Sequence, residues 1–159
     1  MKKRFYLMAS MLMALAACAL PGGAAYADSI SVQPSELVRV YDGDTFFVNI
    51  PSVPAVFGES IGVRMRHIDT PEMRSHCSTD SAKDHELQLA DQAKLQLTAK
   101  LQGASTIELR NTGRDKYFRL LADVYVDGVN VADQLKADGL AVSYEGDTKT
   151  GWCLDPPTA

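Results

Sequence analysis

The alternation of hydrophobic and polar residues predicts a chain built mainly from short strands. Five segments carry either this alternation or the enrichment in β-branched and aromatic residues that is typical of strands: 36–41, 44–50, 61–68, 105–111 and 117–128. The first two meet at Asp42-Gly43, a strong hairpin signal. The segment PSVPAVFGES, which contains two prolines and a glycine, predicts a loop before the third strand. The polar stretch TGRDK predicts a turn before the last strand.

Two segments have helical spacing instead. Apolar residues recur every three or four positions within 82–101, and Gly103 follows as a stop signal. A second helix is predicted in VADQLKAD, with Asn130 as its N-cap and Gly139 at its end. We found no internal repeat.

Five short strands with a helix inserted after the third fit an α+β fold, a five-stranded OB-fold β-barrel with two or three helices. Periodicity alone also allows other small α+β folds. The predicted domain covers 36–153, after a linker at 28–35 and before a C-terminal tail at 154–159.

The N-terminal segment 1–27 has the pattern of a secretory signal peptide. Basic residues at 2–4 precede an apolar run at 5–20 and an A-x-A site that ends at Ala27, after which we expect cleavage. The run is short for a spanning helix. We therefore expect an exported protein, periplasmic or secreted. The stretch LAAC allows an alternative, a lipoprotein anchored to the membrane through Cys18.

Charge limits the partners of the exported chain. The whole sequence has 16 basic and 20 acidic residues, and the signal segment removes three basic ones, which leaves a net charge of −7. Such a chain has no general attraction for nucleic acid. Binding of phosphate therefore requires a local basic patch or a bound cation.

Cys77 and Cys153 are the two cysteines that remain after cleavage. In an exported protein, such a pair most simply forms a disulfide. The alternative is a zinc site that recruits His76 and His85, but these residues lack a recognisable ligand spacing.

Candidate chemistry gathers at the strand ends. HIDTPE ends the third strand with Asp69, Thr70 and Glu72, Arg64 lies within that strand, and Asp44 follows the hairpin turn. Carboxylate and carbonyl oxygens suit a hard divalent cation, and an arginine suits the oxygens of a phosphate. Each acid taken alone also fits an ordinary polar turn. Strict alternation puts Arg64 and Asp69 on opposite faces, so the turn has to redirect the carboxylate.

A second cluster, DKYFR, offers Lys116 and Tyr117 for contact with phosphate and a base, and Arg119 beside them. Read alone, these residues also fit a turn that enters a strand.

The motifs VYDGDT, VRMRHIDTPE, DKYFRLLADVYVDG and ADGLA, in this order, resemble the thermonuclease (staphylococcal nuclease-like) family from about Leu37 to Tyr144. The resemblance implies an OB-fold endonuclease that depends on calcium, hydrolyses DNA and RNA, and leaves 3′-phosphate ends. Carried over, Asp44 and Asp69 match the family's calcium carboxylates, and Thr70 matches its carbonyl ligand. Glu72 falls at the proposed general base.

The same resemblance assigns the basic residues. Arg64 and Arg119 match the two arginines that grip the phosphate, while Lys116 and Tyr117 match contacts to the terminal phosphate of a bound nucleotide. The metal is expected to be one Ca²⁺ ion, since oxygen ligands also admit Mg²⁺ or Mn²⁺ and the choice rests on the family.

The sequence therefore predicts a monomeric metal-dependent phosphodiesterase with DNA and RNA as substrates, and no stable protein partner. A membrane is involved only if Cys18 is lipidated. Two other functions remain open: a non-catalytic OB-fold module that binds nucleic acid or a partner, and a calcium-stabilised surface domain.

Overall fold

The structure is a computed structural model that describes residues 29–146, 148–149 and 151–153 of the 159-residue chain. The predicted signal segment, with Cys18, and the predicted tail at 154–159 lie outside the described residues. In the described part of the chain, no helix combines the length and the apolar character needed to cross a membrane.

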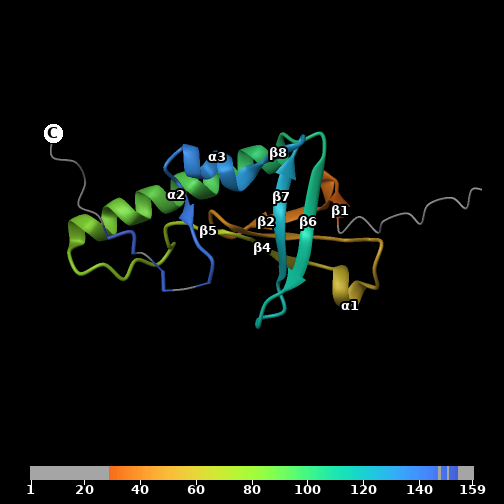
Figure 1. Cartoon of the computed structure of the whole chain (residues 1–159), viewed down its shortest axis with the longest axis horizontal. Helices are drawn as coiled ribbons and strands as arrows, with labels where there is room; N and C mark the ends of the chain where they lie inside the picture. The colour runs from red at the N-terminus through yellow and green to blue at the C-terminus, as the bar shows by residue number, and fades with distance from the viewer. Residues whose placement is uncertain (1–28, 147, 150, 154–159) are drawn as a thin grey trace, which may run out of the picture.

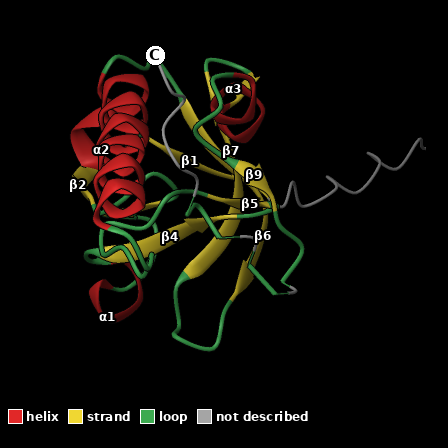
Figure 2. Ribbon diagram, turned by 90° about the vertical axis from the view of Figure 1, so that its left-hand side faces the viewer, coloured by secondary structure: helices red, strands yellow, loops and turns green. Residues whose placement is uncertain are grey.

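A strongly curled sheet forms the centre of the fold (Figure 1, Figure 2). Its strand order is β1-β6-β7-β4-β3-β2, with β8 paired to β7, while β5 and β9 form a separate two-stranded sheet. All pairs are antiparallel except β4 with β7. The strands are β1 Ser29–Val32, β2 Leu37–Val40, β3 Thr45–Val48, β4 Ile61–Met65, β5 Ile68–Asp69, β6 Ile107–Arg114, β7 Leu120–Val126, β8 Val129–Asn130 and β9 Val142–Ser143.

Three α-helices accompany the sheet in the described residues: α1 Ala55–Gly58, α2 Asp80–Gln102 and α3 Val131–Ala137. A short 3-10 helix covers Pro34–Glu36. The α+β, OB-like barrel is thus the fold that the sequence predicts, and β2, β3, β4, β6 and β7 are its five expected strands.

Helix α2 packs its predicted apolar stripe against the sheet. Ala90, Ala93, Leu97 and Leu101 are all fully buried, among core residues that include Phe46. The long helix lies along the sheet and contacts α3 (Figure 1). Asn130 caps α3 as predicted, because its side chain accepts hydrogen bonds from the first amides of the helix.

The structure corrects three local predictions. Part of the predicted linker, residues 29–32, forms β1, which pairs with β6 and buries Val32. A segment of four residues has too little periodicity to be read as a strand without its partner. The predicted loop before β4 contains α1, and the predicted TGRDK turn lies later, at 115–119, because β6 continues to Arg114.

The predicted third strand is broken near its end. β4 stops at Met65, and His67 has a φ of 60° before β5 begins at Ile68. A left-handed residue interrupts the alternation of side chains that a continuous strand would keep. This break is the turn that redirects Asp69 toward the side of the sheet that carries Arg64.

Candidate active site

A cleft of about 830 Å³ opens where four segments meet. They are the β2–β3 turn, the end of β4 with the residues after it, the β6–β7 turn, and residues 144–146 with Lys149 after β9. Of the eight residues predicted for catalysis, metal binding and substrate binding, seven line this cleft: Asp44, Arg64, Thr70, Glu72, Lys116, Tyr117 and Arg119. The eighth, Asp69, is buried against Arg64 at the edge of the cleft.

The hairpin turn holds Asp44 through close packing at Gly43. A Cβ atom on Gly43 would lie 2.6 Å from the Ala93 side chain and 2.9 Å from that of Thr70. Only glycine therefore lets the turn approach both α2 and Thr70. The amide and the hydroxyl of Thr70 both donate to Asp44 Oδ2, at 3.3 Å and 3.1 Å. The predicted role of the Thr70 carbonyl as a ligand stays a prediction.

Burial dominates the electrostatics of Asp44. It raises the pKa of this carboxyl to about 7, against the lowering effect of Arg64 and with a further rise from Asp42. Arg64 Nη1 forms an ion pair with Asp44 Oδ2. Arg64 compensates the negative charge of this buried carboxylate only in part. Asp44 is therefore suited to bind a further cation.

Arg64 connects the two predicted metal carboxylates. Its Nη2 atom lies 3.7 Å from Asp69 Oδ1 and donates to the carbonyl of Ile68 at 3.2 Å. The guanidinium is mostly buried, so both contacts form in a medium of low polarity. Arg64 also lines the cleft, so one guanidinium contacts both carboxylates from the cleft wall.

Lys149, from the segment after β9, contacts two of the acids. Its ammonium lies 2.8 Å from Asp69 Oδ1, in a direction that makes an ion pair rather than a hydrogen bond, and it also pairs with Glu72. Burial lowers the pKa of Lys149, but contacts with Asp69 and Glu72 raise it more, so the net pKa is above its ordinary value. The side chain of Lys149 therefore supplies a positive charge to Asp69 and Glu72.

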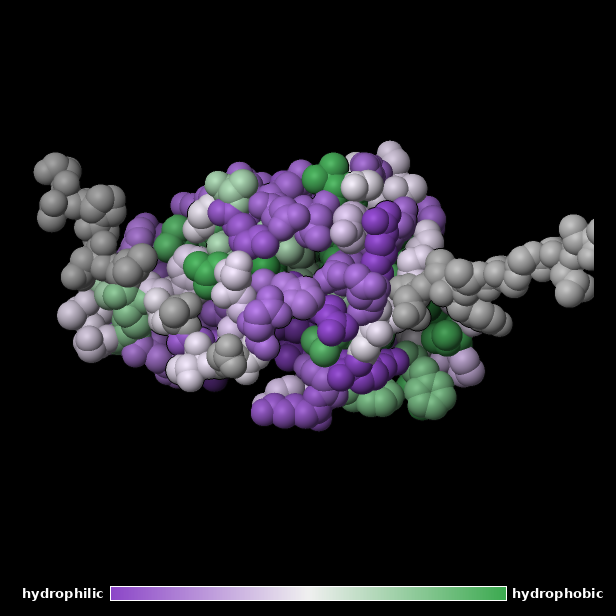
Figure 3. All heavy atoms as spheres, viewed as in Figure 1, coloured by the Kyte–Doolittle hydropathy of each residue, from purple (hydrophilic) through white to green (hydrophobic). Residues whose placement is uncertain are grey.

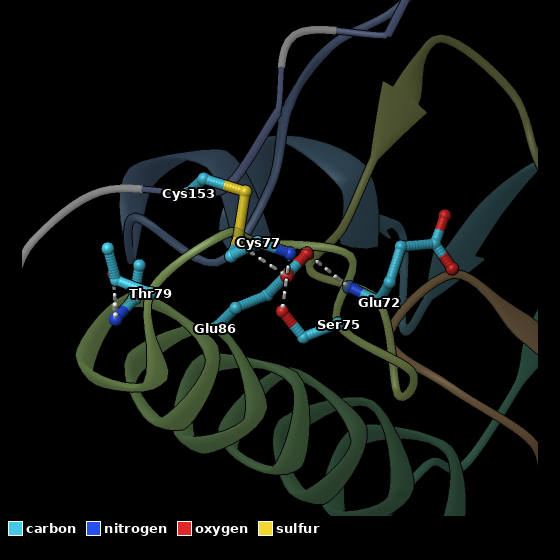
Figure 4. Close-up of a disulfide and its surroundings, with 7 residues drawn as sticks. Glu72, Ser75, Cys77, Thr79, Glu86 and Cys153 are labelled. Atoms are coloured by element: carbon cyan, nitrogen blue, oxygen red, sulfur yellow. Dashed lines mark hydrogen bonds between the residues drawn. A yellow bond between two sulfur atoms is a disulfide. The ribbon is translucent and has the colours of Figure 1, made fainter.

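Glu72 is half exposed and aims into the cleft, while its backbone is anchored from behind. Its amide donates to Glu86 Oε1, at 3.3 Å, from a carboxylate buried on α2 (Figure 4). The other oxygen of Glu86 contacts the sulfur of Cys77 at 3.2 Å, and Cys77 is bonded to Cys153. A disulfide sulfur has no proton to donate, so this is a contact only.

The Cys77–Cys153 disulfide confirms the predicted pairing. It also excludes the alternative zinc site, because neither sulfur is a thiolate that could bind the metal. The bond ties the segment before α2 to the end of the described chain, not far beyond Lys149, which lines the cleft.

The β6–β7 turn supplies the second basic group. Arg119 Nε lies 2.7 Å from Asp115 Oδ2, and Asp115 Oδ1 accepts from the amides of Tyr117 and Arg119. Burial raises the pKa of Asp115, but its hydrogen bonds with Arg119 and with both amides lower it more, so the net pKa is below its ordinary value. The loop therefore aims Arg119 into the cleft, with Lys116 and Tyr117 exposed beside it.

The donor set fits a hard divalent cation. Asp44 and Asp69 offer buried carboxylate oxygens, and Asp69 Oδ1 accepts no hydrogen bond among the described residues. Oxygen donors without a thiolate or imidazole are the ligands that Ca²⁺ and Mg²⁺ prefer. With all three acids ionised, Arg64 and Lys149 leave one negative charge, and Lys149 occupies the same Asp69 and Glu72 oxygens that a divalent ion would bind.

Sequence reasoning missed Lys149, Asp115 and Glu86. Lys149 lies in an aperiodic tail, and the predicted disulfide to Cys153 was the one signal that this tail returns to the acidic motif. Asp115 reads as a turn residue, although its position four residues before Arg119 indicates a local pair. No pattern marked Glu86, whose burial depends on the packing of α2.

Comparisons with known proteins identify the family of this chain. Residues 62–152 match the family described as staphylococcal nuclease homologue. The chain belongs to the staphylococcal nuclease family. This region contains all of β4 except Ile61, the HIDTPE motif, the β6–β7 turn and Lys149, whereas the hairpin with Asp44 precedes it.

Two characterised relatives of this family member come from Bacillus subtilis (strain 168). They are endonuclease YncB and SPbeta prophage-derived endonuclease YokF, each 36% identical to the chain over an alignment of 121 residues that covers 71% of the chain. The matched part covers 50% of YncB and 36% of YokF. The chain thus spans half or less of the length of these relatives.

Proposed function

We propose that this chain is an exported endonuclease that depends on calcium, hydrolyses phosphodiester bonds of DNA and RNA, and leaves 3′-phosphate ends. The observation that carries the proposal is the meeting of acids and arginines from three separate segments in one cleft, in a chain of the nuclease family. The names of two relatives as endonucleases support the reaction class.

The mechanism assigns each residue one task. Asp44, Asp69 and the carbonyl of Thr70 would hold the cation. A bound calcium ion supplies positive charge to the non-bridging phosphate oxygens. Arg64 and Arg119 grip the same phosphate and stabilise the charge that develops during attack.

Glu72 takes a proton from a water molecule as its oxygen attacks phosphorus. The bond from phosphorus to the 5′-oxygen breaks, and that oxygen leaves as a hydroxyl after it receives a proton from solvent. The phosphate stays on the 3′ side. Lys116 and Tyr117 hold the nucleotide next to the broken bond.

The direct test is cleavage of single-stranded DNA by the purified protein, with added calcium or with a calcium chelator. We expect cutting with calcium only. Glu72→Gln should fold normally and lose about a hundredfold or more in kcat, because a general base typically contributes this much.

Glu59→Gln is the matched control, since Glu59 is exposed and lies outside the cleft. Full turnover in a folded Glu72→Gln protein would refute the general-base role. A protein that binds DNA under chelation but never cuts it with any divalent metal would instead be the non-catalytic binding module.

A further inference from the structure

The β2–β3 hairpin carries an arginine stacked between two aromatic rings. Arg39 Cζ lies 3.8 Å from the ring centroid of Phe47 and 5.6 Å from that of Tyr41. Arg39 and Phe47 are cross-strand partners, so their stacking follows from the register of the hairpin. Such cation–π contacts fix the guanidinium in place without neutralising its charge.

This stack continues to the phosphate-binding side of the cleft. A Cβ atom on Gly62 would lie 3.3 Å from Arg119 Cγ and 3.5 Å from Phe47 Cε1, so these two side chains flank the same glycine. Arg119 Cζ is then 5.6 Å from the ring centroid of Tyr117. We call these five residues the rim row: Tyr41, Arg39, Phe47, Arg119 and Tyr117.

Three members of the rim row are exposed to solvent, and Phe47 and Arg119 are partly buried. Tyr41 is 54% exposed and Tyr117 is 68% exposed, and both line the cleft. Arg39 is exposed and has no carboxylate within ion-pair distance among the described residues. In a chain with excess negative charge, the row is therefore a local site where rings and a cation remain available together.

Cross-strand stacking could by itself explain Arg39 and Phe47, because such pairs stabilise a sheet. It does not explain why the large ring of Tyr41 stays half in water at the mouth of a cleft. Alternating rings and basic groups along a groove are the chemistry by which proteins bind single-stranded nucleic acid. The bases of a duplex are stacked on each other, so their faces are not available to such rings.

We propose that the rim row is a stacking platform for single-stranded nucleic acid next to the scissile phosphate. Tyr41 stacks on a base that lies beyond the nucleotide held by Tyr117, and Arg39 contacts a backbone phosphate between them. The position relative to the scissile phosphate rests on the proposed function. The binding itself does not.

The test measures binding without cleavage. Fluorescence anisotropy with a labelled oligothymidylate of about 12 nucleotides, within the span of OB-fold sites, is recorded in chelator. We expect Tyr41→Ala and Arg39→Ala each to weaken binding about tenfold, and Tyr41→Phe to retain it. Thymidine 3′,5′-bisphosphate, which is too short to reach Tyr41, should bind all three variants as it binds the unchanged protein.

Phe57→Ala is the matched control. Phe57 is 50% exposed on α1 and does not line the cleft. Apolar side chains lie at the surface at the lower right of Figure 3, where the same view in Figure 1 shows α1. Thermal unfolding of each variant checks the fold. Unchanged oligonucleotide affinity in Tyr41→Ala, an equal loss in Phe57→Ala, or no binding by the unchanged protein would each overturn the platform.

Cleavage with calcium separates this proposal from the proposed function. Binding through the rim row without any cleavage would support the stacking platform and refute the proposed hydrolytic function. Cleavage of long single strands by Tyr41→Ala with an unchanged KM would support the proposed hydrolytic function and refute the stacking platform.

Discussion

At the scale of single residues, the buried carboxyl of Asp44 makes stability depend on pH. Its pKa of about 7 in the folded protein lies above the ordinary value of 3.8, so the folded state binds the proton more tightly than the unfolded state. The resulting stabilisation is complete below pH 3.8 and is lost as the pH rises through 7. A bound cation favours the ionised form and reverses this trend.

In chelator, we expect Asp44 to make the protein about 3 kcal/mol more stable at about pH 5 than at about pH 8. Urea unfolding at both values measures this difference, and Asp44→Asn supplies the reference in which it is absent. Calcium should stabilise the unchanged protein more at the higher pH. An identical pH dependence in Asp44→Asn would show that this carboxyl does not titrate as described.

His67 illustrates how one residue can set the geometry of a site. Its left-handed backbone ends β4 and turns Asp69 toward Arg64. Histidine is among the side chains that tolerate this conformation better than β-branched residues do. The ring also gains contacts there, with Nδ1 at 2.7 Å from Glu145 Oε2.

At the scale of elements, the segment that follows β9 returns to the cleft and brings its own cation. β9 pairs with β5, the amide of Tyr144 bonds to the carbonyl of His67, and Lys149 then reaches Asp69 and Glu72. A divalent ion bound by these acids competes with the lysine ammonium. If these acids hold a divalent ion as proposed, this segment would lower their affinity for it.

We expect Lys149→Gln to bind calcium about threefold to tenfold more tightly than the unchanged protein, in line with the modest energy of a partly exposed ion pair. Titration calorimetry measures the affinity. Lys136→Gln removes another lysine with a carboxylate partner, on α3 and outside the cleft, and should leave it unchanged. Equal or weaker calcium binding in Lys149→Gln would contradict the competition.

At the scale of the whole molecule, the disulfide joins residues 76 positions apart. Closing so long a loop stabilises a protein by about 4 kcal/mol in the chain-entropy model. We expect a reductant, or replacement of both cysteines by alanine, to lower the free energy of unfolding by about this amount. Urea unfolding measures it, and the double variant should not respond to reductant. An unchanged free energy in reduced protein would mean that the bond contributes little.

Export is the second prediction at this scale. Mass spectrometry of the protein isolated from its source should find an N-terminus at Asp28, because the A-x-A site ends at Ala27. A lipid-modified N-terminal Cys18 would favour the anchored form instead. An intact Met1 in the mature protein would contradict both.

Local patterns in the sequence were enough to predict several parts of the fold. The Asp42-Gly43 hairpin, the stripe of α2, the Asn130 cap and the five central strands depend on neighbours within a few residues, so periodicity and turn chemistry reveal them. The resemblance to a nuclease family likewise rested on contiguous motifs, and the family match confirms it.

Only the tertiary structure decided what lies opposite those motifs. β1 became a strand through pairing with β6, Glu86 became buried through the packing of α2, and Lys149 reached the acids through β9 and the disulfide. Each of these outcomes joins residues far apart in the chain, and short-range periodicity carries no information about which distant segments meet. The sequence by itself determined the chemical groups of the site; the folded chain determined which charges surround them.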